Sequence, residues 1–211
     1  MLLFVEPAVL GAYTLAASAI VISPGPDTML ILRYTLTSGQ RVGLATVAGV
    51  QLGLVVHTVA AVLGLSLLIM SMPALFRAVA LAGAGYLGWL GVQSFRAGVL
   101  SLSEDGVRVG AVKAARDAMI CNILNPKVIV LFLALMPGFL RPERGDVPAQ
   151  LVTLGVVLIL VNVVWQVGLT TAAEAARRWL SEPRVQRVVS WLTGLILLAF
   201  AVLMVVEHGV G

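Results

Sequence analysis

Six stretches of this 211-residue sequence are long and apolar enough to cross a lipid bilayer as α-helices. A bilayer core about 30 Å thick needs about 20 apolar residues in a helix. Lipid offers no hydrogen-bond partner to a peptide group, so a spanning segment must be a helix or part of a closed barrel. The runs are continuous and do not alternate over about ten residues, which favours helices over barrel strands. The stretches cover residues 7–32, 42–70, 74–95, 118–140, 147–172 and 188–206.

The composition supports a lipid-facing surface. Hydrophobic residues make up 60% of the chain and charged residues 11%, against about 25% charged residues in ordinary globular proteins. So few charged side chains cannot cover a water-facing surface. The sequence therefore predicts an all-α, polytopic membrane protein. No Lys or Arg precedes the first apolar run, so we expect that run to be a span and not a cleaved signal peptide.

One polar segment divides the chain. Residues 96–117 mix both charge signs and separate three predicted spans from three others. We expect a single transmembrane domain over residues 1–211. Its halves are residues 1–98 and 116–211, joined by a cytoplasmic loop at 99–115. Three spans in each half mean that the halves insert with opposite orientation.

Several classes of function are disfavoured. Cys121 is the one cysteine, so an intramolecular disulfide, a CxxC pair and a cysteine-based zinc site are excluded. The net charge of +4 comes from basic residues scattered between apolar runs, which does not indicate nucleic-acid binding. Neither HExxH nor a GxxxxGK[ST] loop occurs. We therefore expect no metal, no cofactor, no nucleic-acid partner and no enzymatic activity.

The first span contains a helix break. Pro24 and Pro26 lack the backbone N–H that continues a helix, and each clashes with the preceding turn. Ser23 and Gly25, which precede the prolines, are pushed out of helical geometry. The helix can restart with Pro26 in its first turn. Asp27 then lies where the positive end of the helix dipole favours an acid.

A second break is predicted in the fourth span. Pro126 frees the carbonyl of Asn122 and moves Asn125 out of helical geometry. Lys127 follows directly, as Asp27 follows Pro26. Broken helices at corresponding places in inverted halves indicate a transporter binding site. We therefore expect the breaks to approach each other. With the predicted bounds they lie about 18 and about nine residues into their spans, nearer the cytoplasmic half than the midplane.

These motifs together resemble those of the LysE/RhtB family of amino-acid exporters. The resemblance rests on SPGPDTMLIL, the glycine-rich second span, GYLGWLGV in the third span and NPK in the second half, and it covers essentially the whole chain. It implies a secondary transporter in the bacterial inner membrane. It also implies that an amino acid or a close derivative is exported from the cytoplasm at the expense of the proton motive force. The alternatives are a membrane channel and an intramembrane enzyme.

Asp27 and Lys127 are the leading candidates for substrate binding or coupling. Asp27 could bind a substrate ammonium or a coupling proton, and its alternative role is to stabilise a helix N-terminus. Lys127 could attract a carboxylate or pair with Asp27, and its alternative is snorkelling to the headgroups. The freed carbonyls of Ile20, Ile22 and Asn122 could serve as further acceptors for an ammonium.

Other polar residues lie inside predicted spans. His57 could relay protons, or it could bond to a neighbouring helix. Gln51 lies in the same span on a different face. Asn162, Gln166 and Thr170 recur every four residues, which predicts an inward polar stripe. Interhelical hydrogen bonding is the default reading of that stripe, and lining of a substrate pathway is the alternative.

The second span also carries a ridge of small residues. Gly49 and Gly53 form a GxxxG match that Ala45 extends. Such ridges let helix backbones approach closely. Packing between helices of one chain is the first interpretation, and a homodimer interface is the alternative.

The distribution of Lys and Arg predicts the topology. Ten lie in loops on one side and three on the other, and the richer side should be cytoplasmic, with both termini outside. Reporter fusions after residues 38, 105 and 181 should therefore all report the cytoplasm. A periplasmic signal at residue 105 would contradict this topology. The ten are Arg33, Arg41, Arg96, Arg108, Lys113, Arg116, Arg177, Arg178, Arg184 and Arg187, and the three are Arg77, Arg141 and Arg144.

Overall fold

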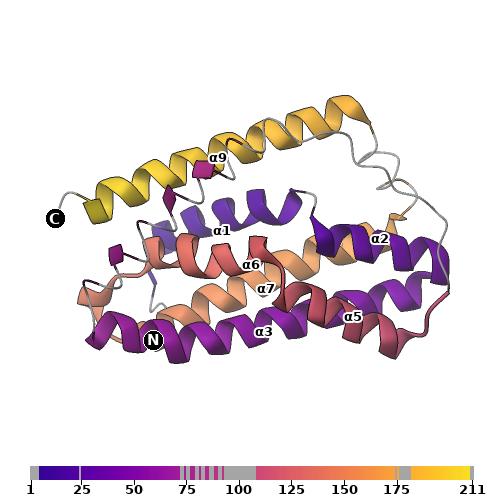
Figure 1. The fold of residues 1–211 in the computed structure, drawn as a ribbon, viewed down its shortest axis with the longest axis horizontal. Coiled ribbons are helices and arrows are strands. Elements are labelled where there is room, and N and C mark those ends of the chain that lie inside the picture. The colour runs from indigo at the N-terminus through magenta and orange to yellow at the C-terminus, as the bar shows by residue number, and fades with distance from the viewer. Residues whose placement is uncertain are drawn as a thin grey trace.

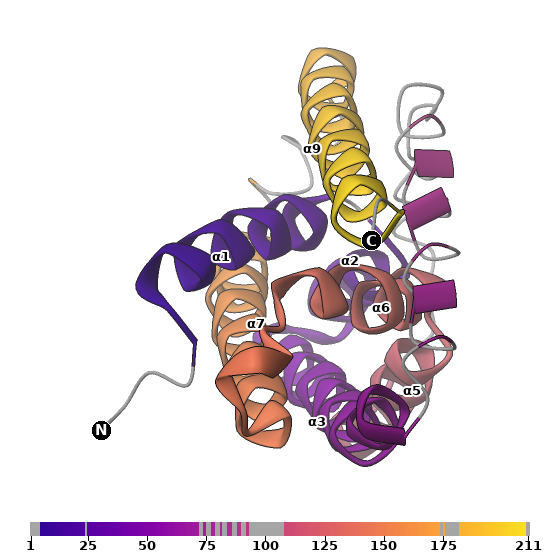
Figure 2. The same cartoon turned by 90° about the vertical axis from the view of Figure 1, so that its left-hand side faces the viewer.

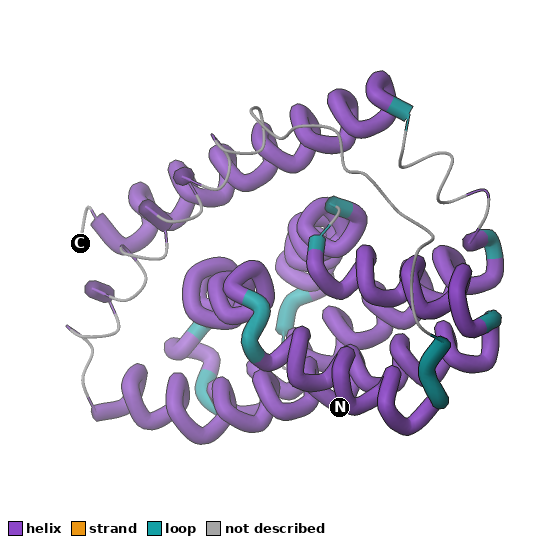
Figure 3. The backbone as a smooth tube through the Cα atoms, turned by 45° about the vertical axis from the view of Figure 1, so that its right-hand side comes forward, coloured by secondary structure: helices purple, strands orange, loops and turns teal. Residues whose placement is uncertain are grey.

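A computed structural model of the chain is helical in nearly all of the residues that it describes, and no β-strand occurs among them (Figure 3). The all-α prediction is confirmed. Most of the third predicted span lies outside the described residues, as does Pro24. The described residues are 5–23, 25–71, 74, 77–78, 81, 84–85, 88–89, 92, 108–173, 175 and 182–209.

The first predicted span is a broken helix. Helix α1 covers Pro7–Ile22 and helix α2 covers Pro26–Ser38, and the two bend by 55°. The Ser23 N–H still reaches the carbonyl of Ala19, at 3.3 Å. Gly25 is extended and forms the N-cap of α2, and Pro26 opens that helix, as predicted.

The fourth predicted span is broken in the same way. Helix α5 covers Ala111–Ile123, helix α6 covers Pro126–Val130, and the two parts of this span bend by 50°. The span continues as a π-helical turn, η1 (Leu131–Leu135), and a 3₁₀ turn, η2 (Met136–Phe139). Pro137 lacks a backbone N–H, and the helix departs from α geometry around it.

Both breaks lie near the middle of their helix pairs, and their placement towards the cytoplasmic half of the membrane stays a prediction. Helix α1 supplies 16 residues before the first break and α2 supplies 13 after it. Helix α5 supplies 13 residues before the second break. Hydropathy detects where a helix meets lipid and not where it ends. The polar turns at the end of α2 and the start of α5 were therefore left out of the predicted spans.

Three longer helices are continuous. They are α3 (Gln40–Ser71), α7 (Val147–Thr171) and α9 (Pro183–Gly209). Among the described residues, two helices are separately long and apolar enough to cross a membrane, one in residues 40–64 of α3 and the other α7. Each bent pair adds one more if it counts as a single span. The full set of six spans stays a prediction.

Corresponding elements of the two halves run in opposite directions. In Figure 1, α1 and α2 run from left to right, whereas α5 and α6 run from right to left. Helices α3 and α7 are opposed in the same sense. This is the course that inverted halves require, although the division into halves at 98 and 116 stays a prediction.

The ends of the bundle also differ as the charge pattern predicted. The α2–α3 turn, the start of α5, the end of α7 and the start of α9 all lie at the right-hand end in Figure 1. The connection from η2 to α7 lies at the other end, where Arg144 forms an ion pair with Glu6. The described parts of the basic-rich loops therefore share one end of the molecule.

The outer surface of the bundle is apolar. Leu15 on α1 is 73% exposed and Val164 on α7 is 75% exposed, and similar side chains line the outer faces of α3 and α9. Viewed along its long axis, the bundle holds α2 and α6 near its centre, with the other labelled helices around them (Figure 2). A surface of this kind is stable in lipid and costly in water.

The small-residue ridge of α3 packs against α5. A Cβ atom at position 49 would lie 2.0 Å from the carbonyl oxygen of Ala115. A Cβ at position 53 would lie 2.5 Å from Oδ1 of Asn122. Both glycines are buried inside the chain's own fold. The prediction of packing within one chain is confirmed for this ridge.

Gly49→Ala should therefore destabilise the fold, by about 1–3 kcal/mol, because the new methyl group meets backbone that cannot rotate away. Gly64→Ala, on the same helix, is the matched control, because a Cβ there meets nothing within 4 Å. The control should be neutral or stabilising by about 0.5–1 kcal/mol, since alanine is the better helix former. Thermal unfolding of the purified variants in detergent measures both effects. Equal stability of the two variants would contradict the close contact between α3 and α5.

Candidate functional site

Asp27 lies in the first turn of α2 and is 8% exposed. Its Oδ2 atom accepts hydrogen bonds from Nδ2 of Asn122, at 2.9 Å, and Nδ2 of Asn125, at 3.1 Å. Its Oδ1 atom is buried and has no hydrogen-bond partner among the described residues. The carboxylate is thus anchored by one oxygen atom and leaves the other as an acceptor.

Lys127 makes the reciprocal contact. Its Nζ donates to the carbonyl oxygen of Ser23 at 2.5 Å, and its backbone N–H donates to Oδ1 of Asn125 at 3.0 Å. The second contact makes Asn125 the N-cap of α6. Each break therefore binds a charged residue of the other, and the prediction that the breaks approach each other is confirmed.

Asp27 and Lys127 do not form a direct ion pair in this structure, although both residues are described. Direct pairing was one of the arrangements that we expected. The lysine instead binds a neutral carbonyl group, and the carboxylate binds two neutral amides. Neither charge is neutralised by the other through a hydrogen bond.

The carbonyl of Asn122 is not free, which corrects its expected role as an acceptor for an ammonium. It accepts the N–H of Asn125 at 3.0 Å and lies 3.3 Å from Nε2 of His57. The His57 ring also stacks on Phe132, with 5.4 Å between ring centroids. His57 thus contacts a neighbouring helix, which was one of its two expected roles, and it is not among the residues that line the pocket described next.

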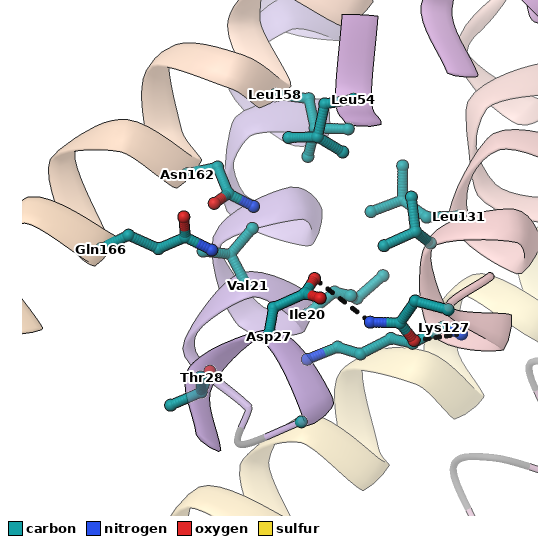
Figure 4. A pocket seen from close by; sticks show the side chains of 13 residues that line it. Ile20, Val21, Asp27, Thr28, Leu54, Lys127, Leu131, Leu158, Asn162 and Gln166 are labelled. Atoms are coloured by element: carbon teal, nitrogen blue, oxygen red, sulfur yellow. Dashed lines mark hydrogen bonds between the residues drawn. The ribbon is translucent and has the colours of Figure 1, made fainter. Parts of the chain in front are cut away.

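An interior pocket lies between the two breaks, α3 and α7, with a volume of about 30 Å³. That is room for about one or two water molecules. In Figure 4, Asp27, Lys127 and Thr28 lie in the lower part, Leu54 and Leu158 lie above, and Leu131 lies on the side opposite Asn162 and Gln166. Its polar lining residues are Asp27, Thr28, Asn125, Lys127, Asn162 and Gln166. Its apolar lining residues are Ile20, Val21, Leu54, Val128, Leu131 and Leu158.

The polar stripe of α7 faces inward, as predicted. Nε2 of Gln51 donates to Oε1 of Gln166 at 2.9 Å and reaches Oδ1 of Asn162 at 3.4 Å. Thr170 bonds to the carbonyl of Gln166 within the helix. Interhelical hydrogen bonding is therefore confirmed, since Asn162 and Gln166 join α7 to α3. The same two residues line the pocket, and the lining of a substrate pathway stays a prediction.

The other predicted site residues contribute backbone. Gly25 lines the pocket, Pro26 opens α2 at an exposed position, and Pro126 opens α6. Within the described part of the chain, no three His, Cys, Asp or Glu side chains gather as metal ligands would.

Comparison with known proteins identifies the family of this chain. A family model described as LysE type translocator matches residues 18–208. The chain belongs to the LysE type translocator family. The resemblance stated from its motifs is thereby confirmed.

The relatives of this LysE type translocator cover nearly its full length. It is 32% identical over 199 residues to the homoserine/homoserine lactone efflux protein of Salmonella typhimurium, covering 93% of this chain and 96% of the relative. It is 34% identical over 202 residues to the uncharacterized membrane protein YrhP of Bacillus subtilis, covering 90% and 95% of the two chains. It is 25% identical over 206 residues to the leucine efflux protein of an Enterobacter species, covering 94% and 97%. No solved structure gives a significant match.

Sequence reasoning missed part of the translocator's pocket. Thr28 follows Asp27 in the first turn of α2, and that position was the available signal. The carbonyl of Ser23 was also missed as the partner of Lys127. Leu54, Leu131 and Leu158 carry no sequence signal, because leucine is frequent in every predicted span and its facing depends on helix packing.

Substitution of Asn125 should separate its two contacts. Asn125→Ala removes the helix cap and one donor to Asp27, and it should cost about 1–2 kcal/mol of stability. Asn125→Asp keeps a good cap but places a second carboxylate against Asp27. If the amide anchors Asp27, the aspartate variant should unfold at a temperature as low as the alanine variant or lower. An aspartate variant as stable as the wild type would show that Asn125 acts as a cap alone.

Proposed function

We propose that this LysE type translocator exports amino acids or close derivatives from the bacterial cytoplasm, with Asp27 and Lys127 binding the two charges of the substrate. The observation that carries the proposal is a buried carboxylate and an ammonium, held by opposite helix breaks beside one interior pocket. Relatives named as homoserine/homoserine lactone and leucine efflux proteins support this class of substrate.

The charges of a zwitterion match the groups at the breaks. An amino acid brings one ammonium and one carboxylate, and either ion is costly in a low-dielectric interior unless it is paired. Oδ1 of Asp27 has no partner among the described residues and can accept from a substrate ammonium. Lys127 donates to a neutral carbonyl, and a substrate carboxylate is a stronger acceptor than that carbonyl.

We propose that the same carboxylate couples export to the movement of protons. Two neutral amides donate to Oδ2 of Asp27, and no lysine or arginine among the described residues forms an ion pair with it. A proton and a substrate ammonium both neutralise a carboxylate, so the two compete for Asp27. Competition of this kind links outward movement of substrate to inward movement of protons, which is antiport.

The pocket volume indicates that transport involves movement at the breaks. About 30 Å³ is too small for an amino acid, so the elements around the pocket must separate for substrate to enter. Ser23 and Gly25 at the first break and residues 124–125 at the second lie outside the helices. The chain can therefore bend there without breaking helical hydrogen bonds, as hinge residues do. Opening first towards one face and then towards the other would give alternating access around a fixed site.

The proposed setting is the bacterial inner membrane. The end of the bundle that carries most of the described Lys and Arg residues would face the cytoplasm. Both termini would then face the periplasm or the outside. The substrate would enter from the basic end and leave at the end where Arg144 pairs with Glu6.

Replacement of Asp27 tests the proposal. Asp27→Asn keeps the shape of the side chain but removes its charge. The variant should reach the membrane at wild-type abundance and lose gradient-driven export to below about a tenth of the wild-type rate, because an ammonium there loses its counter-ion. Glu6→Gln is the matched control, since Glu6 pairs with Arg144 at the far end of the bundle. The control should export normally.

Export is best measured as metabolite release from cells, with and without an uncoupler. A wild-type rate in Asp27→Asn at equal abundance would mean that Asp27 does no more than stabilise the start of α2. Release that continues after the proton gradient is collapsed would identify a channel. Covalent change of the released compound would identify an enzyme.

A further inference from the structure

Asn162 and Gln166 present hydrogen-bond donors to the pocket. Their side-chain oxygen atoms accept from Nε2 of Gln51, which lies on α3. In Figure 4 the amide nitrogen of each residue lies nearer to Asp27 than the amide oxygen does. Neither amide nitrogen has a hydrogen-bond partner among the described residues.

This orientation is not the one that best joins two helices. Gln51 shares a single nitrogen between two acceptors, and its own Oε1 is buried without a partner in the described part of the chain. Buried amide groups without partners are costly. Apolar side chains would pack α3 against α7 at no such cost. The orientation of these amides is explained if the nitrogen atoms of Asn162 and Gln166 donate to a bound substrate.

We propose that Gln51, Asn162 and Gln166 form a specificity subsite that favours neutral amino acids whose side chain carries an oxygen acceptor, such as a hydroxyl or carbonyl group. The inference rests on the proposed function, because it requires Asp27 and Lys127 to hold the ammonium and carboxylate of the substrate. The side chain of the substrate then points towards α7, where the two amide nitrogens donate to its oxygen atom. Gln51 acts as a positioning residue, since it fixes which end of each amide faces the pocket.

The neighbouring groups set the limits of this preference. Leu54, Leu131 and Leu158 line the pocket beside the amides and can cover the methylene groups of a short side chain. The three residues of the subsite carry no charge, so a charged substrate side chain would find no counter-ion there. An aliphatic side chain of equal size would fit but would leave both donors unpaired. A site built to bind a hydroxyl group rejects such an analogue, and two neutral hydrogen bonds are worth about tenfold here.

Two pairs of nearly isosteric substrates test the preference in proteoliposomes with an imposed proton gradient. The pairs are homoserine with norvaline and threonine with valine, and the wild type should transport the hydroxyl member of each about tenfold faster. Asn162→Leu and Gln166→Met keep side-chain size and remove one donor each. Each variant should lower the ratio towards one, chiefly by slowing the hydroxyl substrate.

Gln150→Met is the matched control. Gln150 is a buried glutamine on the same helix, but its amide bonds to the backbone of Arg141 and Gly145, away from the pocket. Its replacement should leave the substrate ratio unchanged, whatever its effect on abundance. A control that shifted the ratio as strongly as the pocket variants would overturn the assignment of the subsite.

Substrate-dependent thermal stabilisation in detergent gives a second readout that does not need transport. Homoserine should raise the unfolding temperature of the wild type more than norvaline, and the pocket variants should lose this difference. Selective binding without export would support the subsite and contradict the proposed export. Export with equal rates and equal stabilisation for both members of each pair would overturn the subsite and leave the proposed function standing. Neither binding nor transport of any of the four would overturn both.

Discussion

The crossing of the two broken helices depends on one carboxylate. Oδ2 of Asp27 accepts from Asn122 and Asn125, so the acid of the first break is held by amides at the second. Lys127 completes the exchange through the carbonyl of Ser23. A helix break in a bilayer exposes polar backbone groups that lipid cannot satisfy, and such a break is tolerated where protein covers it. Here each break covers the other, which explains how two such breaks coexist in so apolar a chain.

Close packing of helices brings these groups within reach. Gly49 lets α3 contact the backbone of α5 at Ala115, and Gly53 leaves the space that the Asn122 side chain occupies. A larger residue at 53 would displace the amide that binds Asp27. On its other side, α3 meets α7 where a Cβ at Gly155 would lie 2.5 Å from Thr58. These three glycines, two on α3 and one on α7, let the helices approach closely and so set the position of the polar groups around the pocket.

The same contacts suggest how binding and movement are linked in this LysE type translocator. The groups that hold the breaks together are those that a zwitterionic substrate or a proton would engage. Under the proposed function, a substrate carboxylate at Lys127 would compete with the carbonyl of Ser23, and a proton on Asp27 would compete with its contacts to the two asparagines. A ligand shifts a conformational equilibrium by its differential affinity for the two states. Contacts that change partner on binding supply that difference.

The sequence by itself determined the membrane setting, the helical class and both breaks, because these follow from local chemistry. Apolar run length requires helices in lipid, and proline cannot continue a helix wherever the rest of the chain lies. It also determined which residues bear charge at the breaks. Only the tertiary structure decided that Asp27 binds two asparagines and not Lys127, that the carbonyl of Asn122 is occupied, and that leucines complete the pocket. Those facts depend on the rotation and separation of helices distant in sequence, which are set by packing across the whole bundle and not by any local pattern.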